Sequence, residues 1–428
     1  MLSLLTIAVV LGQSPSAASS AELSAQVAAL AAEFDAPTRT ARDAAETKLI
    51  ELGPAALEFL PPLGPGASAE RTTRLNRVRA ALYKAQVAES LRGSQVELNL
   101  PETKLSSALA EINKQSGNTV VDFRRSFGQQ ADDLPLVLDV PKVSFWEAVD
   151  RLSLAAGLQP YYFAGTDGLA LVASGREPTP VPWPGKPAYV DYRGAFRIEV
   201  DELILSHNPA ADQSALRVEL SAAWEPRLRP MHATLAMRKL EAVDDRGAKL
   251  EPLNPDLTLE IPPQGKACRI DAAATFEAPP RSVKSLAKLR GSFDVLIPAA
   301  LHTFRFTPLD VRQRRTESAG AVSLALEPPR LNNELVEATI RVTYAEAANA
   351  LESHRAWFYK NPAYLEAADG TRTKPGTIEL LRQSDNELTL NLLFSPAGDW
   401  RNLTLVYQTP AALVVVPAEF EFGNLKLP

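Results

Sequence analysis

One unit of sequence occurs twice between residues 96 and 163, and this duplication constrains the fold more than any other feature. Each copy opens with an alternating strand pattern that ends in proline, VELNLP from Val96 and LVLDVP from Leu136. A helical pattern follows in each copy, ends at Gly117 or Gly157, and leads into a second short strand pattern. The copies align without a gap. The sequence therefore predicts a duplicated strand–helix–strand module.

The two predicted helices present the same apolar face. Ser144 begins the second helix as a capping box with Glu147. We expect the two strands to end at Pro101 and Pro141. We expect residues 169–173 to form a last strand. Two helices on one face of a small mixed sheet are the expected arrangement. The recurring apolar positions are Leu105, Ala108, Leu109 and Ile112 in the first copy and Phe145, Ala148, Val149 and Leu152 in the second.

The spacing Pro101-x-x-x-Leu105-x-x-Ala108-Leu109, followed by a helix that ends in glycine, a strand and a second copy, resembles a known family. This is the secretin and TonB short N-terminal domain, and the resemblance covers residues 95–174. It implies a periplasmic adaptor domain that contacts partner proteins and has no catalytic residues. The rest of the sequence lacks the membrane domains that accompany this domain in those families. The resemblance therefore implies a fold, and not a secretin or receptor role.

The first residues predict export. Residues 1–11 form an apolar run, and small residues follow it up to Ala21. This order is typical of a signal peptide, here residues 1–21 with cleavage between Ala18 and Ala21. The alternative is an apolar start to the first helix, because the run has no initial Lys or Arg. We expect a periplasmic or extracellular protein of a bacterial cell envelope, with no transmembrane segment.

The sequence pattern of residues 22–93 predicts a helical segment. Helical spacing extends over residues 21–34, 38–52 and 68–91, with a further short helix between Gly53 and Leu60. The part from Thr38 to Leu60 resembles a single HEAT-like repeat. A stable solenoid needs about three repeats. We therefore expect a small α-helical bundle.

Prolines separate the module, assigned to residues 94–174, from a β-rich second half. Residues 175–188 form a proline-rich linker in which Trp183 is expected to anchor on a neighbouring domain. Short alternating strands follow, and the stretch from Ile297 has a counterpart from Val416. Two tandem β-sandwiches, immunoglobulin-like in a general sense, are expected at residues 189–311 and 312–428. The predicted fold class is multidomain: an N-terminal α-helical bundle, a small α+β domain and two tandem β-sandwich domains.

Composition argues against several ligands. A net charge of −6 without a basic stripe argues against nucleic acid. Cys268 is the only cysteine, so an internal disulfide is impossible and a buried free thiol is expected. No metal site, cofactor or catalytic residue is expected, because no nucleotide-binding or nucleophile motif occurs and the histidines are scattered. The histidines are His207, His232, His302 and His354. The acidic pairs Asp132–Asp133 and Asp244–Asp245 are expected to serve turns.

Trp146 is the one candidate site residue. The alignment of the copies places it on Ser106, a surface position, so it should point away from the core of its own module. One interpretation is packing against the N-terminal helices or the linker. The other is a hot spot for a protein partner.

Three functions from different classes fit these patterns. The first is an exported, non-enzymatic adaptor or scaffold for protein partners. The second is glycan or peptidoglycan binding through exposed aromatic side chains such as Trp224, Trp357 or Trp400. The third is a hydrolase with a dispersed site, which needs a deep cleft with convergent titratable groups.

Overall fold

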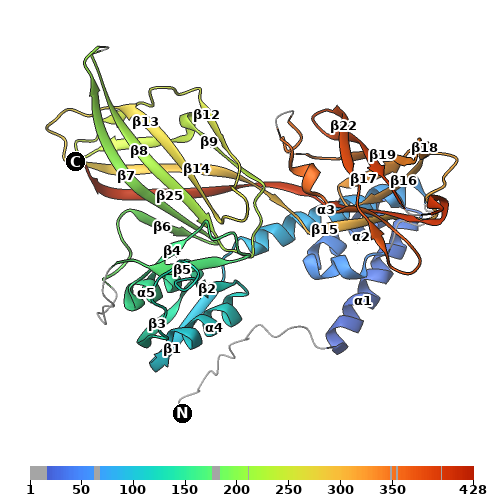
Figure 1. The fold of residues 1–428 in the computed structure, drawn as a ribbon, viewed down its shortest axis with the longest axis horizontal. Coiled ribbons are helices and arrows are strands. Elements are labelled where there is room, and N and C mark those ends of the chain that lie inside the picture. Colours follow the sequence, from blue (N-terminus) through green and yellow to red (C-terminus); the bar gives the residue numbers. More distant parts are fainter. Residues whose placement is uncertain are drawn as a thin grey trace. The chain divides into compact units, whose positions relative to one another are not determined.

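The protein consists of an N-terminal helical region followed by many strands in several sheets (Figure 1). The structure, a computed structural model, describes residues 17–61, 68–175, 184–210, 212–347, 349–352, 355–396 and 398–428. Most of the predicted signal peptide and the linker residue Trp183 lie outside these residues. In the described part, no helix has both the length and the apolar character needed to cross a membrane.

The chain forms two compact units that are interleaved in sequence. Unit 1 contains Met1–Gln86 and Ala299–Ala412, and unit 2 contains Val87–Pro298 and Leu413–Pro428. This order differs from the expected boundary between residues 311 and 312. The last strand, β25 (Leu413–Lys426), pairs with β14 (Ser285–Pro298) along the whole length of both. The C-terminal strand therefore belongs to a sheet of the domain that we expected to end at residue 311.

The helices of unit 1 pack around an apolar cluster that includes Val27, Leu49 and Val78. Thr38 caps the second helix by accepting a hydrogen bond from the backbone of Ala41, as its sequence position allows. The predicted short helix that follows is a 3₁₀ helix. The elements are α1 (Ala17–Ala32), η1 (Glu33–Asp35), α2 (Arg39–Glu51), η2 (Pro54–Phe59) and α3 (Ala69–Ser90), whose end lies in unit 2.

Two antiparallel sheets complete unit 1. In β19 every second side chain from Val336 to Tyr344 is buried, so this strand has one apolar face. The first sheet has the order β15 (Leu301–Phe306), β24 (Thr404–Pro410), β20 (Ala363–Glu366) and β21 (Arg372–Thr373). The second has the order β16 (Arg315–Ala319), β17 (Val322–Leu326), β19 (Leu335–Tyr344), β23 (Glu387–Phe394) and β22 (Thr377–Gln383), and β18 (Arg330–Asn332) also pairs with β19.

The duplicated module of unit 2 has copies whose first strands and helices correspond residue for residue. The first copy is β1 (Gln95–Lys104), α4 (Leu105–Ser116) and β2 (Val120–Asp122). The second is β3 (Pro135–Ser144), α5 (Phe145–Ala156) and β4 (Leu158–Tyr161), with β5 (Leu169–Ala173) after it. Gly117 and Gly157 end their helices in the left-handed conformation, with φ of 67° and 64°. These predictions are confirmed.

Two details of the module differ from the sequence prediction. The strands do not end at Pro101 and Pro141 but continue up to the first residue of each helix. Each proline lies at a register shift of the β1–β3 pair, where a missing N–H disturbs the ladder least. The module also has two sheets in place of one: the antiparallel pair β1–β3, and β2-β5-β4, in which β2 and β5 are parallel.

Two larger sheets make up the rest of unit 2. The first has the order β13 (Arg269–Glu277), β8 (Gln213–Trp224), β7 (Phe196–Asn208) and β6 (Val190–Arg193). The second has the order β11 (Lys249–Leu250), β10 (Glu241–Asp244), β14, β9 (His232–Ala236) and β12 (Thr258–Ile261), with β25 on the other side of β14. A turn that contains Gly247 joins β10 and β11.

Candidate functional site

Strand β7 has a free edge along most of its length. It pairs with β8 as far as Asn208, but β6 covers only its first residues, from Phe196 to Glu199. The N–H of Val200 donates to the carbonyl oxygen of Tyr189 at 2.9 Å, and no strand in the described parts of the chain pairs with this side of β7 beyond that bond. Figure 1 shows the β7–β8 hairpin extending well past β6. A free edge exposes unpaired backbone groups that can bind another strand.

Side chains from the first half of β7 line a cleft of about 540 Å³ within unit 2. Helix α5 contributes Asp150 and Ser153, and β13 contributes Arg269. Arg197, Glu199 and Asp201 come from β7, where their alternate positions place them on one face of the strand. The cleft therefore gathers charged groups from three elements that are distant in sequence.

Ion pairs neutralise the charges of this cleft. Arg197 Nε donates to Asp150 Oδ2 at 2.9 Å, and its Nη1 donates to Glu199. Arg269 Nη2 lies 3.0 Å from Asp201 Oδ2. Asp150 Oδ2 also accepts from the hydroxyl of Tyr192 at 2.6 Å. Each of these carboxylates is therefore held by an arginine.

The electrostatics of the cleft favour this fixed charge state. Burial, the largest single influence, would lower the pKa of Arg197, but the charges of Asp150 and Glu199 and the hydrogen bond to Glu199 contribute to a combined effect that raises that pKa. Burial, and then the charge of Asp150, raise the pKa of Tyr192, which therefore stays protonated as a donor. Burial raises the pKa of Asp201 against the opposing effect of Arg269. No lone base or activated nucleophile results from these pairs.

A second groove, of about 590 Å³, follows the free edge of β7 from Glu199 to Leu203. Its opposite wall is formed by residues 424–428. Tyr189 at one end is 49% exposed, and Leu205, further along β7, is 41% exposed. The free backbone edge thus has apolar side chains beside it, which is the arrangement that binds an extended peptide.

Trp146 lies close to this region but is fully buried. Its indole Nε1 donates to the carbonyl oxygen of Ala195, in the turn between β6 and β7, at 3.0 Å. Trp146 therefore packs against a neighbouring segment, as the first interpretation requires. That segment is the β6–β7 turn, which lies outside the N-terminal helices and the linker that we expected. Trp146 presents no surface to a partner in this structure.

A buried carboxylate joins the module to the large sheets. Glu225 is 0% exposed and follows β8. Its Oε1 accepts from the backbone N–H of Ser94 at 2.6 Å, and its Oε2 accepts from Asn118 Nδ2 at 2.9 Å and from Arg227 Nε at 2.6 Å. The first copy of the module is thus fixed by a charge-assisted network.

The tryptophans proposed for glycan binding are mostly inaccessible. Trp224 and Trp400 are 3% and 7% exposed. Trp357 is half-buried, and its indole N–H donates to the carbonyl oxygen of Ala350 at 2.7 Å. The glycan hypothesis therefore finds little support in these three residues.

Other residues singled out in the sequence have structural roles. Cys268 is a buried free thiol, as predicted, and burial raises its pKa to about 12. Asp133 does not serve a local turn, because its Oδ1 accepts from the backbone N–H of Ser106 at 3.0 Å in α4. Asp244 does serve a turn, accepting from the N–H groups of Arg246 and Ala248. No three His, Cys, Asp or Glu side chains gather into a possible metal site in the described ranges, which exclude His354.

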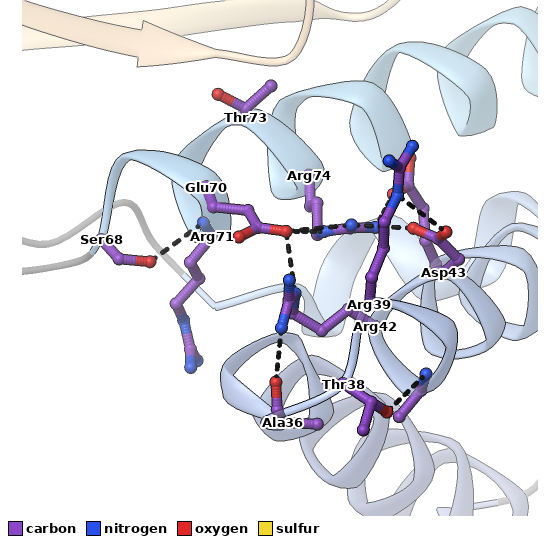
Figure 2. Close-up of polar contacts among 12 residues, drawn as sticks. Ala36, Thr38, Arg39, Arg42, Asp43, Ser68, Glu70, Arg71, Thr73 and Arg74 are labelled. Carbon is purple, nitrogen blue, oxygen red and sulfur yellow. Dashed lines mark hydrogen bonds and ion pairs between the residues drawn. The ribbon is translucent and has the colours of Figure 1, made fainter.

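A cluster of charged side chains links α2 and α3 in unit 1 and was not predicted from the sequence. Figure 2 shows the Arg74 guanidinium reaching between Glu70 and Asp43. It lies 3.0 Å from Glu70 Oε1, 2.8 Å from Asp43 Oδ1 and 2.6 Å from Glu46 Oε2. Hydrogen bonds from Arg74 lower the pKa of both Asp43 and Glu70. Because Arg74 is 4% exposed and already bonded to several carboxylates, the cluster has a structural role in joining the two helices.

The sequence contained one signal for the β7 cleft that we did not use. Arg197, Glu199 and Asp201 alternate along the sequence of β7. Charged side chains at every second position of a strand that is otherwise apolar indicate a polar face with partners of its own.

No family model, curated protein or solved structure matches the chain.

Proposed function

We propose that the protein is an exported, non-enzymatic cell-envelope protein that acts as an adaptor or scaffold for protein partners. In this proposal it contains an N-terminal helical bundle, a module that resembles the secretin and TonB short N-terminal domain, and two β-sandwiches built from the sheets of each unit. The signal-like first residues support export. The partner would contribute an extended segment that adds to the free edge of β7.

The observation that carries this proposal is the free edge of β7 beyond Val200. Backbone hydrogen bonds along such an edge provide affinity for an extended chain, and the flanking grooves provide specificity. Tyr189 and Leu205 supply exposed apolar contacts at the edge. The exposed acidic residue Glu202 lines the same groove and favours a segment with a basic side chain.

The hydrolase hypothesis is weaker for a chemical reason. General acid–base catalysis needs a titratable group whose proton can be exchanged with the substrate. In the cleft beside β7, Asp150 and Glu199 are held by Arg197, and Asp201 is held by Arg269. This arrangement favours a binding surface over a catalytic pair.

Site-specific photocrosslinking in cells of the native host tests the adaptor role. A photoreactive phenylalanine derivative at Leu205 should give an adduct with a partner protein. The matched control is Leu257, which lies in the same unit and is 45% exposed against 41% for Leu205. Leu203→Lys, which places a charge on the edge, should abolish the adduct without changing the melting temperature. Recovery of only uncrosslinked monomer at Leu205, or equal adducts at both positions, would refute the proposal.

A further inference from the structure

Unit 1 contains a groove that is independent of the β7 edge. It has a volume of about 480 Å³ and lies between η4 (Trp357–Lys360), the start of β20 and the segment that leads from β21 into β22. In the two sheets of unit 1, β21 and β22 are edge strands, and β21 covers β20 only at Leu365 and Glu366. The groove therefore follows an edge of the sheets and is open to long ligands.

The charged side chains that line this groove are all basic. Lys360, Arg372 and Lys374 line it, and no carboxylate does. Arg372 is partly neutralised, because its Nε donates to Glu366 Oε1 at 3.0 Å. Lys360 and Lys374 are exposed and have no hydrogen bond or ion pair within the part of the chain that the structure describes. The groove thus presents two unneutralised ammonium groups in a protein whose net charge is −6.

Aromatic rings accompany these cations. Tyr359 is 42% exposed, and its ring is supported from behind by buried Phe358 at a centroid distance of 4.6 Å. Tyr364 is held on its face by Arg372, whose Cζ lies 4.5 Å from the ring centroid. A rigid, exposed ring has a negative face that attracts the C–H groups of a flat apolar surface such as one side of a sugar ring.

The floor of the groove is fixed. Asn361 Nδ2 donates to Tyr407 Oη and to Thr409 Oγ1, each at 3.0 Å. Both of these acceptors belong to buried residues of β24. The segment between Tyr359 and Tyr364 is therefore anchored at Asn361, so that the two rings at its ends keep a defined separation.

We infer that this groove binds an acidic glycan, a chain of sugar rings that carry carboxylates. A ring would stack on Tyr359, and carboxylates would accept hydrogen bonds from Lys360 and Lys374. A nucleic acid fits less well, because its affinity depends on neutralising many phosphates along a basic track. Here the basic residues are confined to one groove, and acidic Glu366 and Asp369 lie in the adjoining hairpin. The three tryptophans of the sequence-based glycan hypothesis do not line the groove.

Isothermal titration calorimetry on the full chain tests the inference with an oligogalacturonate hexamer as the acidic probe and cellohexaose as the neutral one. The acidic probe should bind, and more weakly as salt is raised, whereas cellohexaose should bind at least about tenfold more weakly. The double variant Lys360→Ala/Lys374→Ala should weaken binding of the acidic probe about tenfold or more. Tyr359→Ala should weaken it as well, through loss of the stacking surface.

The matched control is Lys48→Ala/Lys249→Ala, which removes the same charge from two exposed lysines outside the groove. It should leave binding unchanged. The inference is overturned if the unmodified chain does not bind the acidic probe, if both double variants lose the same affinity, or if cellohexaose binds equally well. Tighter binding of a single-stranded oligonucleotide of equal charge would overturn the assignment to a glycan. Melting curves establish that each variant is folded.

Discussion

The two copies of the duplicated module have the same local structure but contact the rest of unit 2 in different ways. Each helix starts and ends at the corresponding residue. The first N–H of each helix donates to the carbonyl oxygen that precedes the strand of the other copy: Leu105 to Leu134 and Phe145 to Ser94, both at 2.9 Å. The copies are thus related by a local pseudosymmetry that extends to their helix caps.

The contacts outside the module break this symmetry. The second copy uses the start of its helix, where Trp146 is buried against Ala195, whereas Ser106 at the same place in the first copy bonds to Asp133. The first copy uses the residues after its helix, where Asn118 binds Glu225, and the second copy has the buried Leu158 at that place. A few substitutions at equivalent positions therefore decide which end of each helix is attached to the large sheets, while the shared positions maintain the fold of the module.

Trp146→Ala should give the largest effect and would break the contact of the second copy. Truncating a fully buried tryptophan removes apolar contact and leaves a cavity, so the free energy of unfolding should fall by about 3–5 kcal/mol. The matched change in the first copy, Ser106→Ala, should cost about 1 kcal/mol or less because Ser106 is at the surface. Urea unfolding followed by circular dichroism measures both. Equal losses would show that the two positions are not energetically distinct.

Glu225→Gln tests the contact of the first copy and should have the next largest effect. The substitution keeps the shape but removes the charge that accepts bonds from Ser94, Asn118 and Arg227, so we expect a loss of about 1.5–3 kcal/mol. Glu97→Gln, on an exposed position of the same copy, is the control and should change stability by less than about 0.5 kcal/mol.

A double-mutant cycle with Asn118→Ala sharpens this second test. If the two residues act through the bond between them, the combined loss should be smaller than the sum of the single losses. Simple additivity would mean that Glu225 stabilises unit 2 independently of its bond to Asn118.

The comparison also explains what the sequence could and could not predict. The helix bounds and glycine caps of both copies were predictable because they depend on residues within one helical turn. The pairing of β25 with β14 was not, because an alternating pattern determines which face of a strand is buried but not which strand lies beside it. The same holds for the contact of Trp146 and for the β7 cleft, where Asp150 meets Arg197 across elements that only the tertiary fold brings together.

The smallest expected difference concerns how the two helices are capped. In α5, Ser144 Oγ accepts from the N–H of Glu147 at 3.3 Å. Lys104 holds the equivalent place in α4 and makes no such bond, and Asp133 accepts from the N–H of Ser106 instead. The predicted reciprocal bond from Glu147 is replaced by bonds that its carboxylate accepts from Arg151. One copy therefore has a neutral cap and the other a charged cap.

These caps should differ in their dependence on pH. Ser144→Ala should cost about 1 kcal/mol at any pH, because a hydroxyl cap does not titrate. The bond from the Ser106 backbone lowers the pKa of Asp133 below its ordinary value of 3.8. Its contribution is therefore complete above pH 3.8 and is lost as the pH falls through the lowered value. Hydrogen exchange at the Ser106 amide should be faster in Asp133→Ala than in the unmodified chain at neutral pH, and this difference should vanish in acid. A difference that persists in acid would mean that the carboxylate charge plays no part in the cap.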